Sequence, residues 1–161
     1  MSKSLKRVKT ALAEGGWAGE ILEMPSETRT AAQAAAAAGC HIDQIAKSII
    51  FQNPATGEIL LFLTAGGNTV DPAKATAAAG SDLGRASAEE VRARTGFAIG
   101  GVAPVGHLTA PRSWCDPRLM EFTTVWAAAG TPRHIFPISP IELVRISAAQ
   151  VIDFTGTARA M

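Results

Sequence analysis

The feature that most constrains the fold of this chain is a pair of apolar runs separated by a short turn. The first run is Ser48–Phe51 and the second is Ile59–Leu63. Between them, Asn53–Gly57 contains the asparagine, proline and glycine residues that favour turns. Near-continuous apolar strands are typical of central positions that are covered on both faces. The pattern therefore predicts two neighbouring strands in a closed or nearly closed barrel, with helices packed against it.

Helices are predicted on both sides of this strand pair. The chain opens with a helix that ends at Gly15, and an alanine-rich helix over 31–38 ends at Gly39. Further helices are predicted where a capping residue precedes a proline or a glutamate: Asp71, Ser87, Asp116 and Ser139. Short strands are predicted at 21–22, 122–127 and 151–154. Because strands and helices do not alternate regularly, an α+β fold is favoured over a doubly wound sheet.

Composition limits the class of protein. The chain has 161 residues, of which 47% are hydrophobic and 18% charged, and this predicts one globular domain over 1–161. The formal net charge is +1, so any RNA contact must come from a local patch or a partner. No apolar run is long enough for a membrane span or a secretory signal. Two cysteines without CxxC spacing predict reduced thiols and a cytoplasmic location.

Lys47 is the first candidate for chemistry. It stands where a polar loop with His41, Asp43 and Gln44 meets an apolar strand. A lysine in that position can pack its stem on the barrel rim and aim its ammonium at a cavity, where it would polarise an ester carbonyl or hold a phosphate. The alternative is a solvated lysine at the end of a strand, which is the commoner state.

Two further segments carry candidate binding groups. The loop Gly100–Gly106 contains three glycines and a proline, so its backbone is fixed in unusual angles and can present N–H groups to an anion or an oxyanion. A rigid turn between strands is an equally good interpretation. Thr28, Arg29 and Thr30 precede the alanine-rich helix, where a cation does not suit the helix dipole. A role facing a ligand competes there with a capping threonine beside a surface arginine.

Other types of site have weak support. The histidines, His41, His107 and His134, lack the close spacing of a zinc site, so no metal is predicted. A Cys–His nucleophile formed by Cys40 or Cys115 is formally open, although buried inert cysteine is commoner. There is no GxSxG elbow of a serine hydrolase.

In order along the chain, these segments resemble the YbaK/ProX family, which is related to the insertion domain of prolyl-tRNA synthetase. The resemblance covers about residues 25–155. Its most specific parts are the lysine ahead of the strand and the GxxxPxG loop. The matching segments are Thr28–Thr30 with the helix to Gly39, Gln44–Phe51, Leu61–Gly66, Val70–Asp71 with Lys74, Ala86–Gly96, Gly100–Gly106, Asp116 with Leu119, and Ala128–Gly130.

The resemblance implies a mixed fold around a barrel-like sheet and hydrolysis of the ester between a wrong amino acid and the 3′ end of a tRNA, most often tRNA for proline. Neither a metal nor an organic cofactor is implied. The essential lysine of the family falls on Lys47. The catalytic loop falls on Gly100 and Gly101, and substrate contacts are expected from the remaining candidates: Thr28, Arg29, Thr30, Pro104, Gly106, His107 and Gly130. The late family motif often carries a charged side chain near 131–133, and here those positions give little acidity.

Three functions are compatible with these residues. The first is a free-standing trans-editing deacylase, which would borrow tRNA identity from a synthetase or an elongation factor. The second is a binding module that holds an aminoacyl-nucleotide or an RNA end without turnover. The third is a hydrolase of a small ester or amide. The amino acid that is removed stays open among alanine, cysteine, serine and threonine, since a small pocket excludes larger residues.

Overall fold

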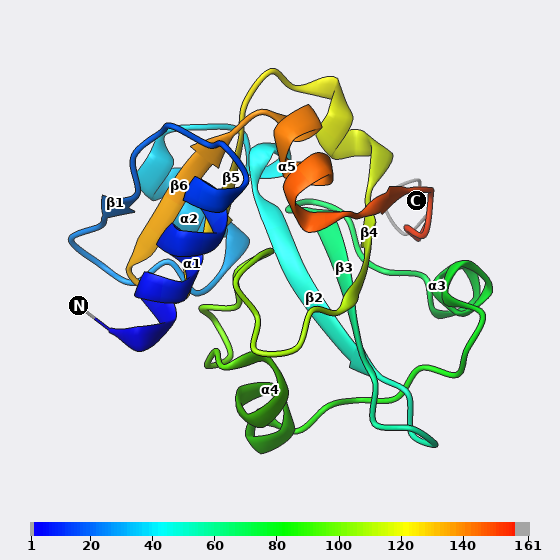
Figure 1. Ribbon diagram of the computed structural model, residues 1–161. Coiled ribbons are helices and arrows are strands. Elements are labelled where there is room, and N and C mark those ends of the chain that lie inside the picture. The colour runs from blue at the N-terminus through cyan, green and yellow to red at the C-terminus, as the bar shows by residue number, and fades with distance from the viewer. Residues whose placement is uncertain (1, 157–161) are drawn as a thin grey trace.

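The computed structural model describes residues 2–156, which fold into two small sheets with helices around them (Figure 1). The mixed order of strands and helices confirms the α+β class. The elements are α1 (Lys3–Glu14), β1 (Leu22–Glu23), α2 (Ala31–Ala38), the 3₁₀ helix η1 (Ile42–Gln44), β2 (Ala46–Gln52), β3 (Ile59–Ala65), α3 (Pro72–Ala79), α4 (Ala88–Thr95), β4 (Arg112–Cys115), the 3₁₀ helix η2 (Pro117–Glu121), β5 (Val125–Ala128), β6 (His134–Ile138), α5 (Pro140–Ser147) and β7 (Gln150–Val151).

The two sheets do not close into the predicted barrel. One sheet has the strand order β2-β3-β4-β7 and the other has the order β1-β6-β5. They meet at an isolated parallel bridge between Ile45 and Trp126, where β2 runs beside β5. The far edges of the sheets are the two-residue strands β7 and β1, which are too short to pair across and close a barrel. The architecture is therefore a pair of open sheets joined along one seam.

The two apolar runs form the expected antiparallel hairpin, but they occupy different positions (Figure 1). Every residue of β3 is buried, because β3 pairs with β2 on one side and with β4 in parallel on the other. Strand β2 lies at the edge of its sheet and is only partly buried beyond Ala46. The central position predicted for the first run is therefore wrong: β2 is an edge strand, Ile49 and Phe51 pack against a hydrophobic cluster on one face, and Ile49 and Ile50 line a cavity.

Local capping sets most of the helix ends. Gly39 closes α2 in the left-handed conformation, with φ of 70°. Ser87 caps α4 by accepting a hydrogen bond from the Glu90 amide, while the carboxylate of Glu90 accepts from Gln52 instead of completing a capping box. A complete capping box, which the sequence analysis did not predict, lies at the start of α2 between Thr30 and Gln33.

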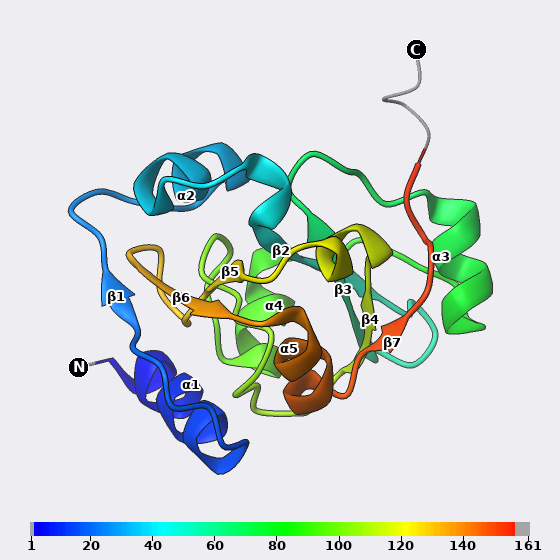
Figure 2. The same ribbon diagram turned by 90° about the horizontal axis from the view of Figure 1, so that it is seen from above.

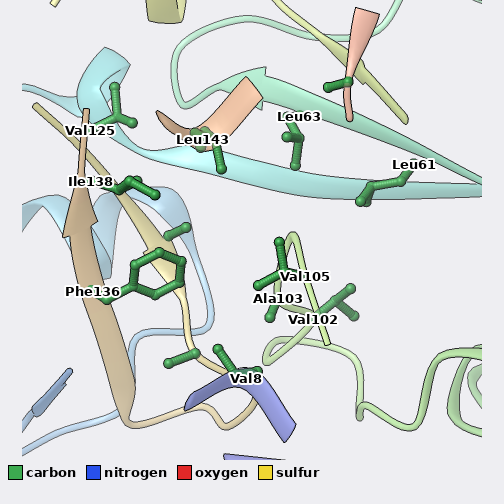
Figure 3. Close-up of a cluster of buried hydrophobic side chains, with 14 of the residues drawn as sticks. Val8, Leu61, Leu63, Val102, Ala103, Val105, Val125, Phe136, Ile138 and Leu143 are labelled. Atoms are coloured by element: carbon green, nitrogen blue, oxygen red, sulfur yellow. The ribbon is translucent and has the colours of Figure 1, made fainter. Parts of the chain in front are cut away.

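The main hydrophobic core lies between the β2–β3 hairpin, the 102–105 segment and the second sheet. Figure 3 shows Leu61 and Leu63 facing Val102, Ala103 and Val105, with side chains of β5, β6, α1 and α5 completing the cluster. A second cluster covers the other face of β3, where the rings of Phe62 and Trp114 stack with centroids 4.8 Å apart. Seen from above, α1 and α2 stand at one end of the molecule and α3 at the other (Figure 2).

Candidate functional site

A cavity of about 660 Å³ runs along the edge of β2. Its walls come from α2 and the residues just before it, residues 46–50 of β2, the 99–102 segment and the strands of the second sheet. Its inner wall is the surface of the main core, which Ile50, Val102 and Ala127 contribute. The charged and hydroxyl-bearing side chains among its lining residues are Thr28, Arg29, Thr30, Lys47 and Ser48.

Lys47 brings a partly buried ammonium to this cavity. It is the second residue of β2, and its Nζ donates a hydrogen bond to the backbone oxygen of Asn68 at 2.7 Å. Burial lowers the pKa of Lys47 below the ordinary lysine range, and the carboxylates of Asp116 and Asp43 offset part of that effect. Lys47 therefore lines the cavity, and its ammonium is held in position by the backbone at Asn68.

Two buried carboxylates hold the turn that anchors Lys47. Asp116 Oδ2 accepts hydrogen bonds from the Ala65 amide at 3.1 Å and from Asn68 Nδ2 at 2.9 Å. Asp43 Oδ1 accepts from the Gly67 amide at 2.8 Å, and its other oxygen accepts from Arg118 at 3.1 Å. The sequence analysis placed Asp43 in a polar loop and interpreted Asp116 only as a helix cap. Their anchoring role was missed because each contact joins positions far apart in the chain.

The glycine loop contributes only its first residues to this cavity. Gly100 lines the cavity and adopts a positive φ of 91°. Val102 lines the cavity from the side of the main core. The Gly101 amide donates to Ala98 O at 3.0 Å, so this N–H is already engaged inside a turn. Within residues 2–156, neither the Gly100 nor the Val102 amide has a backbone hydrogen-bond partner. Val102 is thus a candidate amide that the sequence reasoning did not single out.

The segment before α2 lies at the cavity as expected, but its hydroxyls are occupied. Thr28 Oγ1 donates to Pro132 O at 3.0 Å, and Thr30 Oγ1 accepts the Gln33 amide at 3.1 Å as the helix cap. Arg29 pairs with Glu27 and donates to Ile99 O at 3.1 Å. The guanidinium is half exposed, so it forms part of the rim.

The remaining predicted contacts lie elsewhere. Pro104, Gly106 and His107 line a second cavity of about 730 Å³ between α1 and α5. His107 is packed against Phe97, and its Nε2 hydrogen bonds with Ala103 O at 2.6 Å. Gly130 lies against α1, where an added Cβ would meet Ser4 O at 2.9 Å. The structure therefore does not bring these four residues to the Lys47 cavity.

The other nucleophile and metal candidates are separated in space. Cys115 is buried, and burial raises the pKa of its thiol to about 12, which leaves it without thiolate at neutral pH. Burial also raises the pKa of Cys40. Among residues 2–156, no three histidine, cysteine or carboxylate side chains are grouped as ligands for a metal ion. In the same part of the chain, no helix is long and apolar enough to cross a membrane.

This fold and cavity place the chain among known proteins. Residues 25–146 match the family described as the aminoacyl-tRNA editing domain. The chain is 31% identical to the uncharacterized protein YwhH of Bacillus subtilis (strain 168) over 148 residues, which cover 92% of this chain and 94% of that protein. The chain belongs to the aminoacyl-tRNA editing domain family, which confirms the resemblance found in its sequence.

Solved structures agree with this assignment. A proposed trans-editing enzyme for prolyl-tRNA synthetase is 44% identical, with a TM-score of 0.89 over 97% of this chain and 99% of that chain. A structure from work on epitope backbone grafting onto scaffold proteins is 40% identical, with a TM-score of 0.88 over the same shares of the two chains.

Proposed function

We propose that this chain is a single-domain, cytoplasmic, trans-acting deacylase that hydrolyses the ester of a mischarged tRNA, with tRNA for proline as the first candidate. The observation that carries the proposal is the partly buried Lys47 ammonium, fixed at an apolar cavity in a chain of the editing family. The structure named for prolyl-tRNA synthetase supports the choice of tRNA. A synthetase or an elongation factor would supply the tRNA identity that a chain of net charge +1 does not read alone.

Lys47 is assigned to electrostatics. An aminoacyl ester is already activated, so hydrolysis can proceed through positioning and charge stabilisation without a strong general base. The ammonium would bind the ester carbonyl or the terminal phosphate. Its hydrogen bond to Asn68 O keeps it in place before the substrate arrives. The attacking group is water or a hydroxyl of the substrate itself.

The oxyanion would be stabilised by backbone amides at the start of the glycine loop. Gly100 and Val102 both line the cavity, and their amides are free of backbone partners within residues 2–156. Gly101 supports the loop through its bond to Ala98 and shapes the turn rather than donating to the substrate. The rim residues Thr28, Arg29 and Thr30 would surround the 3′ end of the tRNA.

The test is deacylation of tRNA for proline charged separately with alanine, cysteine, serine, threonine and proline. We expect the protein to clear at least one mischarged species and to spare prolyl-tRNA. A chain that clears none of these, and none of the same amino acids on their other tRNAs, contradicts the proposal. Saturable tRNA binding without turnover would then identify a binding module.

A further inference from the structure

A hydroxyl in the wall of the cavity has no partner. Within residues 2–156, the Oγ of Ser48 is buried and makes no hydrogen bond. Ser48 lies in β2 directly after Lys47 and lines the same cavity. A buried hydroxyl without a partner costs stability, because its hydrogen bond to water is lost and nothing replaces it. Such a group calls for a functional explanation.

The other hydroxyls of the cavity are already engaged with the protein. Thr28 donates to Pro132 O, and Thr30 caps α2. Lys47 is tethered to Asn68 O. Among the hydroxyls of the lining residues, the Ser48 Oγ is thus the one without a hydrogen bond to the protein within residues 2–156.

Strand geometry places Ser48 on the apolar side of the cavity. Successive side chains of a strand point to opposite faces, so Ser48 shares its face with Ala46 and Ile50, while Lys47 lines the cavity from the opposite face of β2. Its cross-strand partner is Leu63, which is fully buried in the main core. The Oγ has almost no exposed surface as it stands, so a ligand reaches it only after a change of χ1 rotamer.

We propose that Ser48 is a specificity-determining residue that hydrogen bonds with a hydroxyl on the side chain of the aminoacyl group, so that this deacylase prefers a seryl or threonyl ester to an alanyl ester. The inference rests on the proposed function and adds the chemical class of its substrate. An apolar wall alone discriminates weakly between alanine and serine, whereas a wall with one unpaired polar group favours the ligand that pairs with it.

The chain supplies a matched control. Ser81 Oγ is also buried and has no partner within residues 2–156, but Ser81 follows α3 and lines neither cavity. Replacing either serine by alanine removes an unsatisfied hydroxyl without a change of backbone. Neither Ser48→Ala nor Ser81→Ala should therefore lower the melting temperature. If the two variants differ in substrate selectivity, the difference arises from the position of Ser48 in the cavity wall.

The experiment compares kcat/KM for seryl-tRNA and alanyl-tRNA built on the same tRNA for proline, in wild type, Ser48→Ala and Ser81→Ala. We expect Ser48→Ala to lower the seryl value by about tenfold and leave the alanyl value unchanged. Ser81→Ala should match the wild type on both. An equal fall on both substrates, or no fall on either, overturns the inference while the proposed function stands.

A binding measurement separates the inference from catalysis. The probes are adenosines that carry a seryl or an alanyl group on the 3′ position through an amide, which replaces the hydrolysable ester. The wild type should bind the seryl probe more tightly, and Ser48→Ala should bind the two equally. If the wild type hydrolyses no ester but shows this pattern, the proposed function fails, and the part of the inference that stands is the hydrogen bond of Ser48 to the side-chain hydroxyl. If the wild type binds the two probes equally, the inference is overturned.

Discussion

The Gly100–Gly106 loop contributes to two cavities of similar size and different character. The first, about 660 Å³, has an apolar core wall and a partly buried lysine. The second, about 730 Å³, is lined by Lys6, Arg7, Glu14 and Arg145 from α1 and α5. In the second cavity, Arg7 is bound to Gly96 O and Gly106 O and so joins α1 to the loop.

Under the proposed function, the character of the lining and not the volume distinguishes the candidate site from the second cavity. A cation acts strongly on a substrate where it is partly dehydrated and fixed, and only Lys47 has both properties among the lysines lining the two cavities. The charges of the second cavity support the structure or are solvated. Three pairs of substitutions and one single substitution test this comparison.

The largest expected effect follows removal of the ammonium in the first cavity. Lys47→Met keeps an unbranched apolar stem and should lower kcat/KM for the preferred mischarged tRNA by about 100-fold or more. The matched change in the second cavity, Lys6→Met, should leave it within about twofold. Single-turnover deacylation measures both, with melting curves as the check on folding. Equal losses would mean that both cavities serve the reaction.

The next effect distinguishes the two ends of the glycine loop. Gly100→Ala and Gly106→Ala each force alanine into positive φ, 91° and 79°, at a cost of about 1–2 kcal/mol in unfolding free energy. The new Cβ at 100 would also meet Arg29 at 3.0 Å in the first cavity, whereas at 106 it would meet backbone of Arg7. We expect Gly100→Ala alone to lower kcat by roughly tenfold. Urea titration and deacylation assays on the two variants decide this, and a similar loss of kcat in Gly106→Ala contradicts it.

A smaller effect concerns the approach of the RNA. Arg29 lies on the rim of the first cavity, and Lys6 lies on the second. If the tRNA end enters the first cavity, Arg29→Gln should weaken tRNA binding by about fivefold. It should also reduce the magnitude of the slope of log K against log salt by about one, which corresponds to the loss of one phosphate contact. Lys6→Gln should change neither quantity. Filter binding at several salt concentrations is the measurement, and the reverse result would place the RNA on α1.

The smallest effect is on stability and not on catalysis. Burial, with a contribution from Arg7, lowers the pKa of His107, and the hydrogen bond to Ala103 offsets part of the shift. The unfolded chain therefore takes up this proton first, so stability is lost as pH falls through the ordinary histidine range of about 6.5 toward the lower folded pKa. His107→Gln should remove that part of the pH dependence with kcat unchanged. Urea titrations between pH 5 and pH 8 measure it, and a fall in kcat would return His107 to the substrate site.

Local interactions explain what the sequence predicted well. The turn at Asn53–Gly57 sets the hairpin, and Gly39 and Asp71 set helix ends through contacts within a few residues. The sequence also grouped Lys47 and Gly100 in one site, and the two residues line one cavity. Their catalytic roles stay predictions.

Non-local pairing explains what was missed. Strand β4 (Arg112–Cys115) pairs in parallel with β3 and β7 and is buried beyond Arg112, yet it contains no apolar run that would predict a strand. The contact between Asp116 and Asn68 spans 48 positions, so its anchoring role depends on the assembled fold. The division of the glycine loop between two cavities likewise follows from the helices on each side, and a contiguous motif cannot show it.

The bond between Lys47 Nζ and Asn68 O has a geometric consequence. An ammonium has three N–H bonds in a tetrahedral arrangement, and one of them donates to the backbone oxygen of Asn68. Within residues 2–156 the ammonium makes no other hydrogen bond, so its two remaining N–H groups, at a fixed angle to each other, can reach two separate oxygen atoms at once. Lys47 would then favour substrates in which the ester carbonyl oxygen and a neighbouring ribose or phosphate oxygen are separated by the distance that these two N–H groups can span. A planar guanidinium, with its parallel N–H pairs, cannot reproduce that spacing.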